Sequence, residues 1–139
     1  MILPIIKTPN QILLNKSEDI SSEYPELLEL IKNMYETCKS NNGVGLAAPQ
    51  IGLNINLFVV IYENVQKVFI NPKIKESTDT ILITEGCLSV PNKFRPIPRG
   101  SKIEISYFDE NFNNHVDKYD GFIARICLHE YDHLIGKLI

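Results

Sequence analysis

The chain has 139 residues, of which 44% are hydrophobic and 22% charged, a composition typical of one soluble globular domain. Its 14 basic and 17 acidic side chains give a net charge of −3, which disfavours nucleic-acid or membrane-surface binding, since such proteins usually carry a basic patch. No apolar run approaches the roughly 20 residues that cross a bilayer. The three cysteines, Cys38, Cys87 and Cys127, are too few for a disulfide framework. We therefore expect a single domain over residues 1–139, with free thiols in a reducing cytoplasm.

The first strong helical pattern covers residues 25–40. Pro25 suits a first helical turn, and Asn41-Asn42-Gly43 supplies residues that end a helix. Residues 1–7 show no secretory signal and are expected to form an edge strand or to pack on the core. The stripe that this helix turns to the core consists of Leu27, Leu30, Ile31, Met34, Tyr35 and Cys38, at helical spacing.

Residues 43–52 form a glycine- and alanine-rich segment whose backbone another chain can approach closely, and which lacks the lysine of a P-loop. The three prolines within residues 91–98 predict an irregular loop. Asp120 can cap a second helix that begins near Gly121 and ends at Gly136. The apolar patterns predict strands over 57–62, 68–70, 81–83, 103–107 and 115–119, the first two joined as a hairpin that ends at Asn71-Pro72.

These elements predict an α+β fold. Mostly antiparallel strands surround a C-terminal helix, and an N-terminal helix adds to them. The C-terminal helix carries His129-Glu130-Tyr131-Asp132-His133. Histidines four residues apart share one helix face and can bind one metal ion, while the intervening glutamate can move a proton of the attacking water. Because so short a motif also arises by chance, two unrelated surface histidines are the alternative.

A catalytic metal site of this kind needs a third protein ligand. The candidates are Cys87, Cys127, His115 and several carboxylates. Cys127 is rotated by about 200° from His129 on the helix and points away, and His115 has polar neighbours typical of a surface residue. Cys87 follows Glu85-Gly86 in a segment of unusual backbone, although a buried structural cysteine is the alternative at that position.

Three segments together resemble the signature motifs of the peptide deformylases, in the family's order. They are residues 43–50 (GVGLAAPQ), 85–89 (EGCLS) and 129–134 (HEYDHL). Residues 69–72 (FINP) and Arg99 also look like family positions, so the resemblance covers nearly the whole chain. It implies a peptide-deformylase-like fold and a metal-dependent hydrolase that removes the formyl group from the N-terminal formyl-methionine of nascent polypeptides, releasing formate.

The resemblance also implies roles for particular residues. Cys87, His129 and His133 hold one divalent metal, Fe²⁺ in the cell, with Zn²⁺, Ni²⁺ or Co²⁺ able to take its place in a preparation. Glu130 handles the proton, and the Gln50 side chain and the Leu88 backbone N–H donate to the oxyanion.

The implied substrate site is a strand-like groove. The peptide main chain lies beside Val44-Gly45 and Gly86, where a Cβ would keep it away. Glu85 and Arg99 form an ion pair that stiffens the loop around the pocket, unless they are two unrelated surface charges. The methionine pocket is expected to be walled by Val44, Ile83, Phe122, Ile126 and the aliphatic stem of Arg125.

The chain departs from the family at three places. Leu128 replaces a common glutamine and is expected to be a packing residue, and Phe94 stands where some members carry an arginine that helps to hold the peptide. The short C-terminus, Ile139, resembles that of deformylases encoded by some bacteriophages, with a truncated sequence as the competing explanation. We expect a cytoplasmic monomer, in a bacterial host if phage-encoded, that meets formyl-methionyl peptides at the ribosome and binds neither nucleic acid nor membrane.

Two other functions fit part of the pattern. A general metallopeptidase would share the helix motif, but it usually takes its third ligand downstream, where only six residues remain, none of them His, Cys, Asp or Glu. A catalytically inactive homologue that binds formylated peptides or a structural metal would need neither Glu130 nor Gln50.

Overall fold

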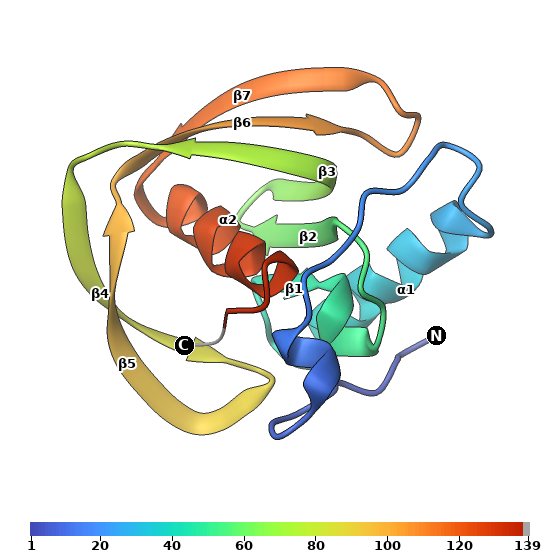
Figure 1. Cartoon of the computed structure of the whole chain (residues 1–139), viewed down its shortest axis with the longest axis horizontal. Helices are drawn as coiled ribbons and strands as arrows, with labels where there is room; N and C mark the ends of the chain where they lie inside the picture. Colours follow the sequence, from blue (N-terminus) through green and yellow to red (C-terminus); the bar gives the residue numbers. More distant parts are fainter. Residues whose placement is uncertain (138–139) are drawn as a thin grey trace.

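The computed structural model describes residues 1–137, apart from the side chains of Ile83, Pro91 and Asn92 (Figure 1). Within these residues, no helix is both long and apolar enough to span a membrane. The elements in chain order are the 3-10 turn η1 (Gln11–Leu14), α1 (Leu27–Ser40), β1 (Gly45–Ala47), the 3-10 turn η2 (Ala48–Ile51), β2 (Leu57–Tyr62), β3 (Val65–Glu76), β4 (Thr80–Cys87), β5 (Val90–Gly100), β6 (Lys102–Phe108), β7 (Asn114–Asp120) and α2 (Gly121–Leu134).

A five-stranded antiparallel sheet in the order β1-β2-β3-β6-β7 separates the two helices. Alternate residues of β2 serve the two faces: Phe58 and Val60 pack in the cluster that contains α2, and Leu57 and Val59 in the cluster that contains α1. Because both faces are covered, residues 57–62 form a continuous apolar run rather than an alternating one. The α+β architecture predicted from the sequence is therefore confirmed.

The hairpin β4–β5 forms a second, two-stranded sheet that lies beside α2 (Figure 1). The prediction of an irregular loop over residues 91–98 was wrong, since this segment belongs to β5. Pro96 and Pro98 lie opposite Thr84 and Leu82. The two prolines are two residues apart, so both have their nitrogen on the same side of the strand, and within the described residues β5 pairs with β4 alone. A proline is tolerated in such a strand when its nitrogen faces the outer edge.

The predicted end of the β2–β3 hairpin at Asn71-Pro72 was also wrong, because β3 continues to Glu76. The strand bulges here, with a shift in its register against β6 between Ile70 and Lys73. Asn71 adopts a positive φ of 50°, and its side chain exchanges two hydrogen bonds with the backbone of Ile20, at 2.8 and 2.9 Å. The bulge accommodates the proline without ending the strand.

Both helices lie where the sequence predicted them, and α2 begins at Gly121 as expected but ends at Leu134 rather than at Gly136. The first helix begins at Leu27 rather than Pro25, and its predicted apolar stripe is buried or partly buried. Asp120 is the N-cap residue of α2, but its side chain makes no capping hydrogen bond. Leu128 is buried among the α2-side residues, as expected of a packing residue. Residues 1–7 form no strand, and Ile5 packs beside the α1-side cluster.

We predict that Phe69→Ala lowers the free energy of unfolding by about 3–5 kcal/mol. Phe69 is fully buried, stacks on Phe58 with a centroid distance of 4.9 Å and meets Tyr107 at 4.5 Å, so truncation leaves a cavity at the centre of the sheet. Urea unfolding measures the loss. Leu28→Ala is the control, because Leu28 on α1 is 65% exposed and should cost under about 0.5 kcal/mol. Similar losses in the two variants would contradict the assignment of Phe69 to the core.

Candidate metal centre and active site

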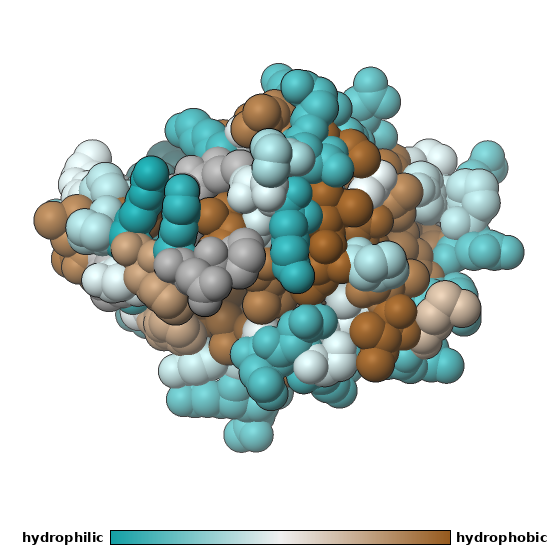
Figure 2. All heavy atoms as spheres, turned by 90° about the horizontal axis from the view of Figure 1, so that it is seen from below, coloured by the Kyte–Doolittle hydropathy of each residue, from teal (hydrophilic) through white to brown (hydrophobic). Residues whose placement is uncertain are grey.

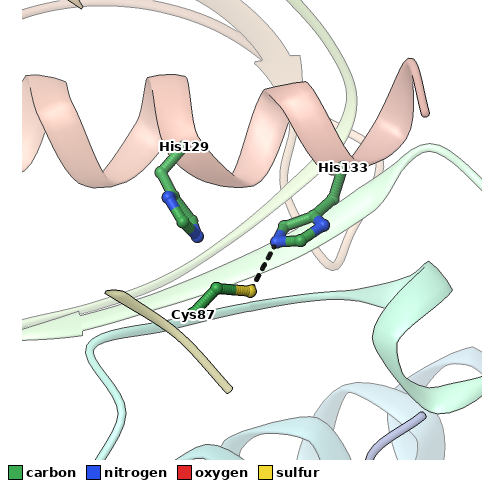
Figure 3. A group of neighbouring side chains, drawn as sticks. All are labelled: Cys87, His129 and His133. Carbon is green, nitrogen blue, oxygen red and sulfur yellow. Dashed lines mark hydrogen bonds between the residues drawn. The ribbon is translucent and has the colours of Figure 1, made fainter. Parts of the chain in front are cut away.

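Cys87, the last residue of β4, meets two histidines of α2, as the sequence predicted (Figure 3). One ligand atom from each of Cys87, His129 and His133 lies within 4.8 Å of the other two. The Cys87 Sγ lies 3.2 Å from the His133 Nε2, and the histidine rings meet edge to face with centroids 5.1 Å apart. One thiolate and two imidazoles at these distances fit a tetrahedral divalent metal with one position open.

Glu85 holds the first of these histidines. Its Oε1 accepts a hydrogen bond from the His129 Nδ1 at 2.8 Å, which leaves Nε2 to face Cys87. Its two oxygens also accept from Arg99, from Nε at 3.0 Å and from Nη2 at 2.8 Å. Burial acts to raise the pKa of Glu85, but the hydrogen bonds with His129 and Arg99 outweigh it and lower that pKa to about 2. This pairing therefore stabilises the fold above pH 4.5, and its contribution is lost as the pH falls toward 2.

Arg99 extends the same network to α2 through its Nη1, which donates to Asp132. Glu85, Arg99 and Asp132 thus join β4, β5 and α2. The sequence analysis missed Asp132, although it lies three residues after His129 and so on the same helix face. The predicted Glu85–Arg99 pair is present, and both of its side chains are buried, with exposed fractions of 8% and 7%.

The two histidines have opposite electrostatic surroundings. Burial lowers the pKa of His133 to about 3, which keeps its imidazole neutral and able to bind a metal. Burial also acts to lower the pKa of His129, but hydrogen bonds with Cys87 and Glu85 outweigh it, and that pKa is raised. A metal ion at this site therefore competes with a proton at His129.

Glu130 is buried on α2, between His129 and His133 in sequence and close to Gly45 of β1. Burial raises its pKa to about 7, a value suited to accepting and releasing a proton near neutral pH. Its Oε1 has no hydrogen-bond partner within the described residues. A Cβ on Gly45 would lie 2.6 Å from the Glu130 Oε2, so this glycine makes room for the carboxylate. From the sequence, the approach of a peptide was the only predicted reason for a glycine here.

Gln50, in η2, has its amide orientation set by the backbone. Its Oε1 accepts from the Ala47 N–H at 2.9 Å, so its NH₂ group faces Cys87 of the candidate metal-ligand cluster. The Nε2 lies 3.7 Å from the Cys87 Sγ and 3.3 Å from the Ser89 Oγ. The sequence analysis assigned no role to Ser89, which is buried in the turn after β4 beside Leu88. Its place in the EGCLS segment was the available signal.

A cavity of about 790 Å³ lies over these groups. It is bordered by β1 and by β4, and by the N-terminal segment, which is tied to the site because the Ile6 N–H donates to the Gln50 carbonyl oxygen at 2.7 Å. Arg99 is not among its lining residues, and the Ile83 side chain lies outside the described residues. The other predicted catalytic and substrate-binding residues all line it: Val44, Gly45, Gln50, Glu85, Gly86, Leu88, Phe122, Arg125, Ile126 and Glu130.

Gly45 presents its backbone to this cavity. The Val44 carbonyl accepts from the Ile61 N–H at 2.8 Å and so points toward β2, whereas the Ala47 N–H points away, to Gln50. Polar groups alternate in direction along a strand, so the N–H and C=O of Gly45 point away from β2 as well. An extended peptide in the cavity would find a strand edge there.

A thiol and two imidazoles that could hold a metal ion lie beside a buried carboxylate and an amide donor. This arrangement is typical of a metal-dependent hydrolase. Comparison with known proteins gives the family. Residues 2–139 match the model of the family described as polypeptide deformylase, and the chain belongs to that family.

Relatives and solved structures match over nearly the full chain. The chain is 41% identical to a peptide deformylase of Christiangramia forsetii, over 99% of this chain and 80% of the relative. It is 44% identical to a peptide deformylase of Karelsulcia muelleri, over 99% of this chain and 76% of the relative. The peptide deformylase structure from Thermotoga maritima superposes with a TM-score of 0.96 at 32% identity, covering 99% of this chain and 95% of that one. The structure of a peptide deformylase from Synechococcus elongatus in complex with actinonin superposes with a TM-score of 0.93 at 38% sequence identity. The match covers 98% of this chain and 75% of that one.

We predict that Arg99→Met lowers the free energy of unfolding by about 3–5 kcal/mol, because it leaves Glu85 buried without its cation. Urea unfolding at pH 7 measures the loss. Lys73→Met is the matched control, since Lys73 pairs with Asp19 at 3.6 Å on the surface and should contribute under about 1 kcal/mol. Equal losses would mean that the buried pair is no stronger than a solvated one.

Proposed function

We propose that this chain removes the formyl group from the N-terminal formyl-methionine of nascent polypeptides and releases formate. The observation that carries the proposal is the buried Glu130, which stands beside the Cys87–His129–His133 cluster at the wall of one cavity. A carboxylate held near neutral pKa next to metal ligands suits the activation of water. Membership of the polypeptide deformylase family supports the choice of a formyl amide as the bond that is cleaved.

Cys87, His129 and His133 are the proposed ligands of one divalent metal. A cation held there supplies Lewis acidity, which makes water nucleophilic near neutral pH and polarises the formyl carbonyl. A thiolate and two imidazoles suit several first-row metals. From the family resemblance we assign Fe²⁺ in the cell, with Zn²⁺, Ni²⁺ or Co²⁺ able to occupy the same ligands in a preparation.

Glu130 takes a proton from the attacking water as the new C–O bond forms at the formyl carbon. The negative charge that develops on the formyl oxygen is met by the Gln50 NH₂ group, whose orientation the Ala47 N–H maintains, and by the N–H of Leu88 at the turn after Cys87. Glu130 then gives its proton to the leaving amine as the C–N bond breaks. The burial that raises the pKa of Glu130 to about 7 supports both transfers.

The substrate main chain is proposed to lie as an added strand between the Gly45 edge and Gly86. Its methionine side chain enters the part of the cavity formed by α2, where Phe122, Arg125 and Ile126 are lining residues, as is Val44. Because main-chain groups provide most of this recognition, peptides of many sequences can bind. Residues 1–139 are proposed to act as one catalytic domain, a monomer in the cytoplasm that meets its substrates at the ribosome.

The metallopeptidase alternative has less support. The third metal-ligand candidate, Cys87, comes from β4, upstream of the helix motif rather than downstream of it. The peptide-binding alternative leaves unexplained why a carboxylate is buried without a hydrogen-bond partner for its Oε1 in the described structure. Such burial is costly and suits a group that handles protons.

The metal assignment predicts about one equivalent of divalent metal per chain, measured by elemental analysis of protein prepared without oxygen. Cys87→Ala should lose the metal, and a chelator should lower the unfolding temperature of the wild type while leaving that of Cys87→Ala unchanged. Cys127→Ala is the matched control, because Cys127 is buried on the sheet side of α2 and should keep its metal. Equal metal contents in the two variants would remove Cys87 from the ligand set.

The role of Glu130 predicts that Glu130→Gln lowers formate release from a short formyl-methionyl peptide by about 10²- to 10⁴-fold with little change in metal content. The amide keeps the size of the side chain but cannot accept the proton. Equal rates would defeat the proposed role of Glu130. An intact, metal-loaded wild type that binds the peptide without releasing formate would favour the binding-protein alternative.

A further inference from the structure

The hairpin β4–β5 carries an exposed aromatic residue at the rim of the cavity. Phe94 on β5 is 72% exposed and yet lines the cavity together with Gly86 and Cys87. Hydrophobic side chains gather in the middle of the molecular face shown in Figure 2, bordered by hydrophilic ones. An aromatic ring left in water at the edge of a binding cavity gains stabilisation when a ligand covers it.

The backbone of β4 positions this ring next to the proposed reaction centre. Phe94 lies directly opposite Gly86, the residue before Cys87, so the ring is one strand position from a proposed metal ligand. A Cβ on Gly86 would lie 2.6 Å from the Phe94 Cε1 and 2.9 Å from its Cδ1. The ring therefore rests on the glycine backbone, in a place that any larger residue at position 86 would occupy.

The alternation of side chains along β4 indicates which substrate residue meets the ring. Glu85 and Cys87 turn their side chains to α2, where they meet His129 and His133. Gly86 and its partner Phe94 belong to the opposite face. In a peptide bound as an added strand, the methionine points to the α2 side. The side chain of the next residue then points to the face that carries Phe94.

We propose that Phe94 is a specificity-determining residue that contacts the side chain of the residue immediately after formyl-methionine and favours an apolar or aromatic one. The inference rests on the proposed function and on the strand-like pose of the peptide. The ring offers apolar contact area and no charge, so an acidic side chain gains nothing from it. Phe94 takes no part in the bond-breaking steps. It changes the relative kcat/KM values of peptides that differ in the residue after formyl-methionine.

The test compares formate release, as kcat/KM, from formyl-Met-Leu-Ser, formyl-Met-Ala-Ser and formyl-Met-Asp-Ser with metal-loaded protein. Because the contact is at an open rim, we expect the wild type to prefer the leucine peptide over the alanine peptide by about fivefold, below what an enclosed pocket achieves. Phe94→Ala should bring this ratio close to one. Phe94→Leu should keep most of the preference.

Leu82→Ala is the matched control, because Leu82 is 68% exposed on the same hairpin and is not a lining residue of the cavity. It should leave the ratio unchanged. Metal content and circular dichroism of each variant establish that it is folded. An unchanged ratio in a folded Phe94→Ala that still releases formate would overturn this inference alone. No formate from any peptide with the metal-loaded wild type would overturn the proposed function, and this inference with it.

Discussion

One buried carboxylate, that of Glu85, holds the site together. It accepts hydrogen bonds from His129 on α2 and from Arg99 on β5 while belonging to β4 itself. Arg99 in turn donates a hydrogen bond to Asp132 on α2. The hairpin β4–β5 is a separate two-stranded sheet, so this network is a polar connection that sets its position against the helix. The approach of Cys87 to the two histidines depends on that position, since Cys87 lies two residues after Glu85.

The close contact between Glu130 and Gly45 links the chemistry of the site to its binding edge. The carboxylate occupies the space on one side of the glycine, and the polar groups of the same glycine face the cavity. Two demands therefore fall on one position: no side chain toward Glu130, and a free backbone toward a peptide. The Cβ that Gly45 lacks would point toward Glu130, so the glycine makes room for the carboxylate, while its N–H and C=O lie at the edge where the peptide is proposed to bind.

Local patterns in the sequence predicted the parts of the fold that local physics determines. The apolar stripe of α1 and the buried run of β2 follow from helical and strand periodicity, and both are present. The extent of β5 could not be predicted in this way, because whether a proline is tolerated depends on which strand edge its nitrogen faces.

The same distinction applies to the site. Cys87 and His133 are 46 positions apart, and residue types alone left Cys87 as one candidate ligand with a structural cysteine as the alternative, until the resemblance between motifs indicated that the two residues meet. Asp132 and Ser89 were missed because their contacts, with Arg99 and with Gln50, are made across different elements. Positions of this kind follow from the packing of the hairpin against α2, which no short window of sequence contains.

The strand edge at Gly45 has a further consequence for turnover. A deformylated product keeps the main chain of the substrate, so it can make the same hydrogen bonds to the enzyme. What differs is its N-terminus, which becomes an amine with a pKa of about 8 and is largely cationic at neutral pH. In the proposed mechanism this amine forms beside Glu130 and the proposed metal ligands, with Arg125 also lining the cavity. The product therefore differs from the substrate in the charge at its N-terminus and not along the main chain that meets the Gly45 edge.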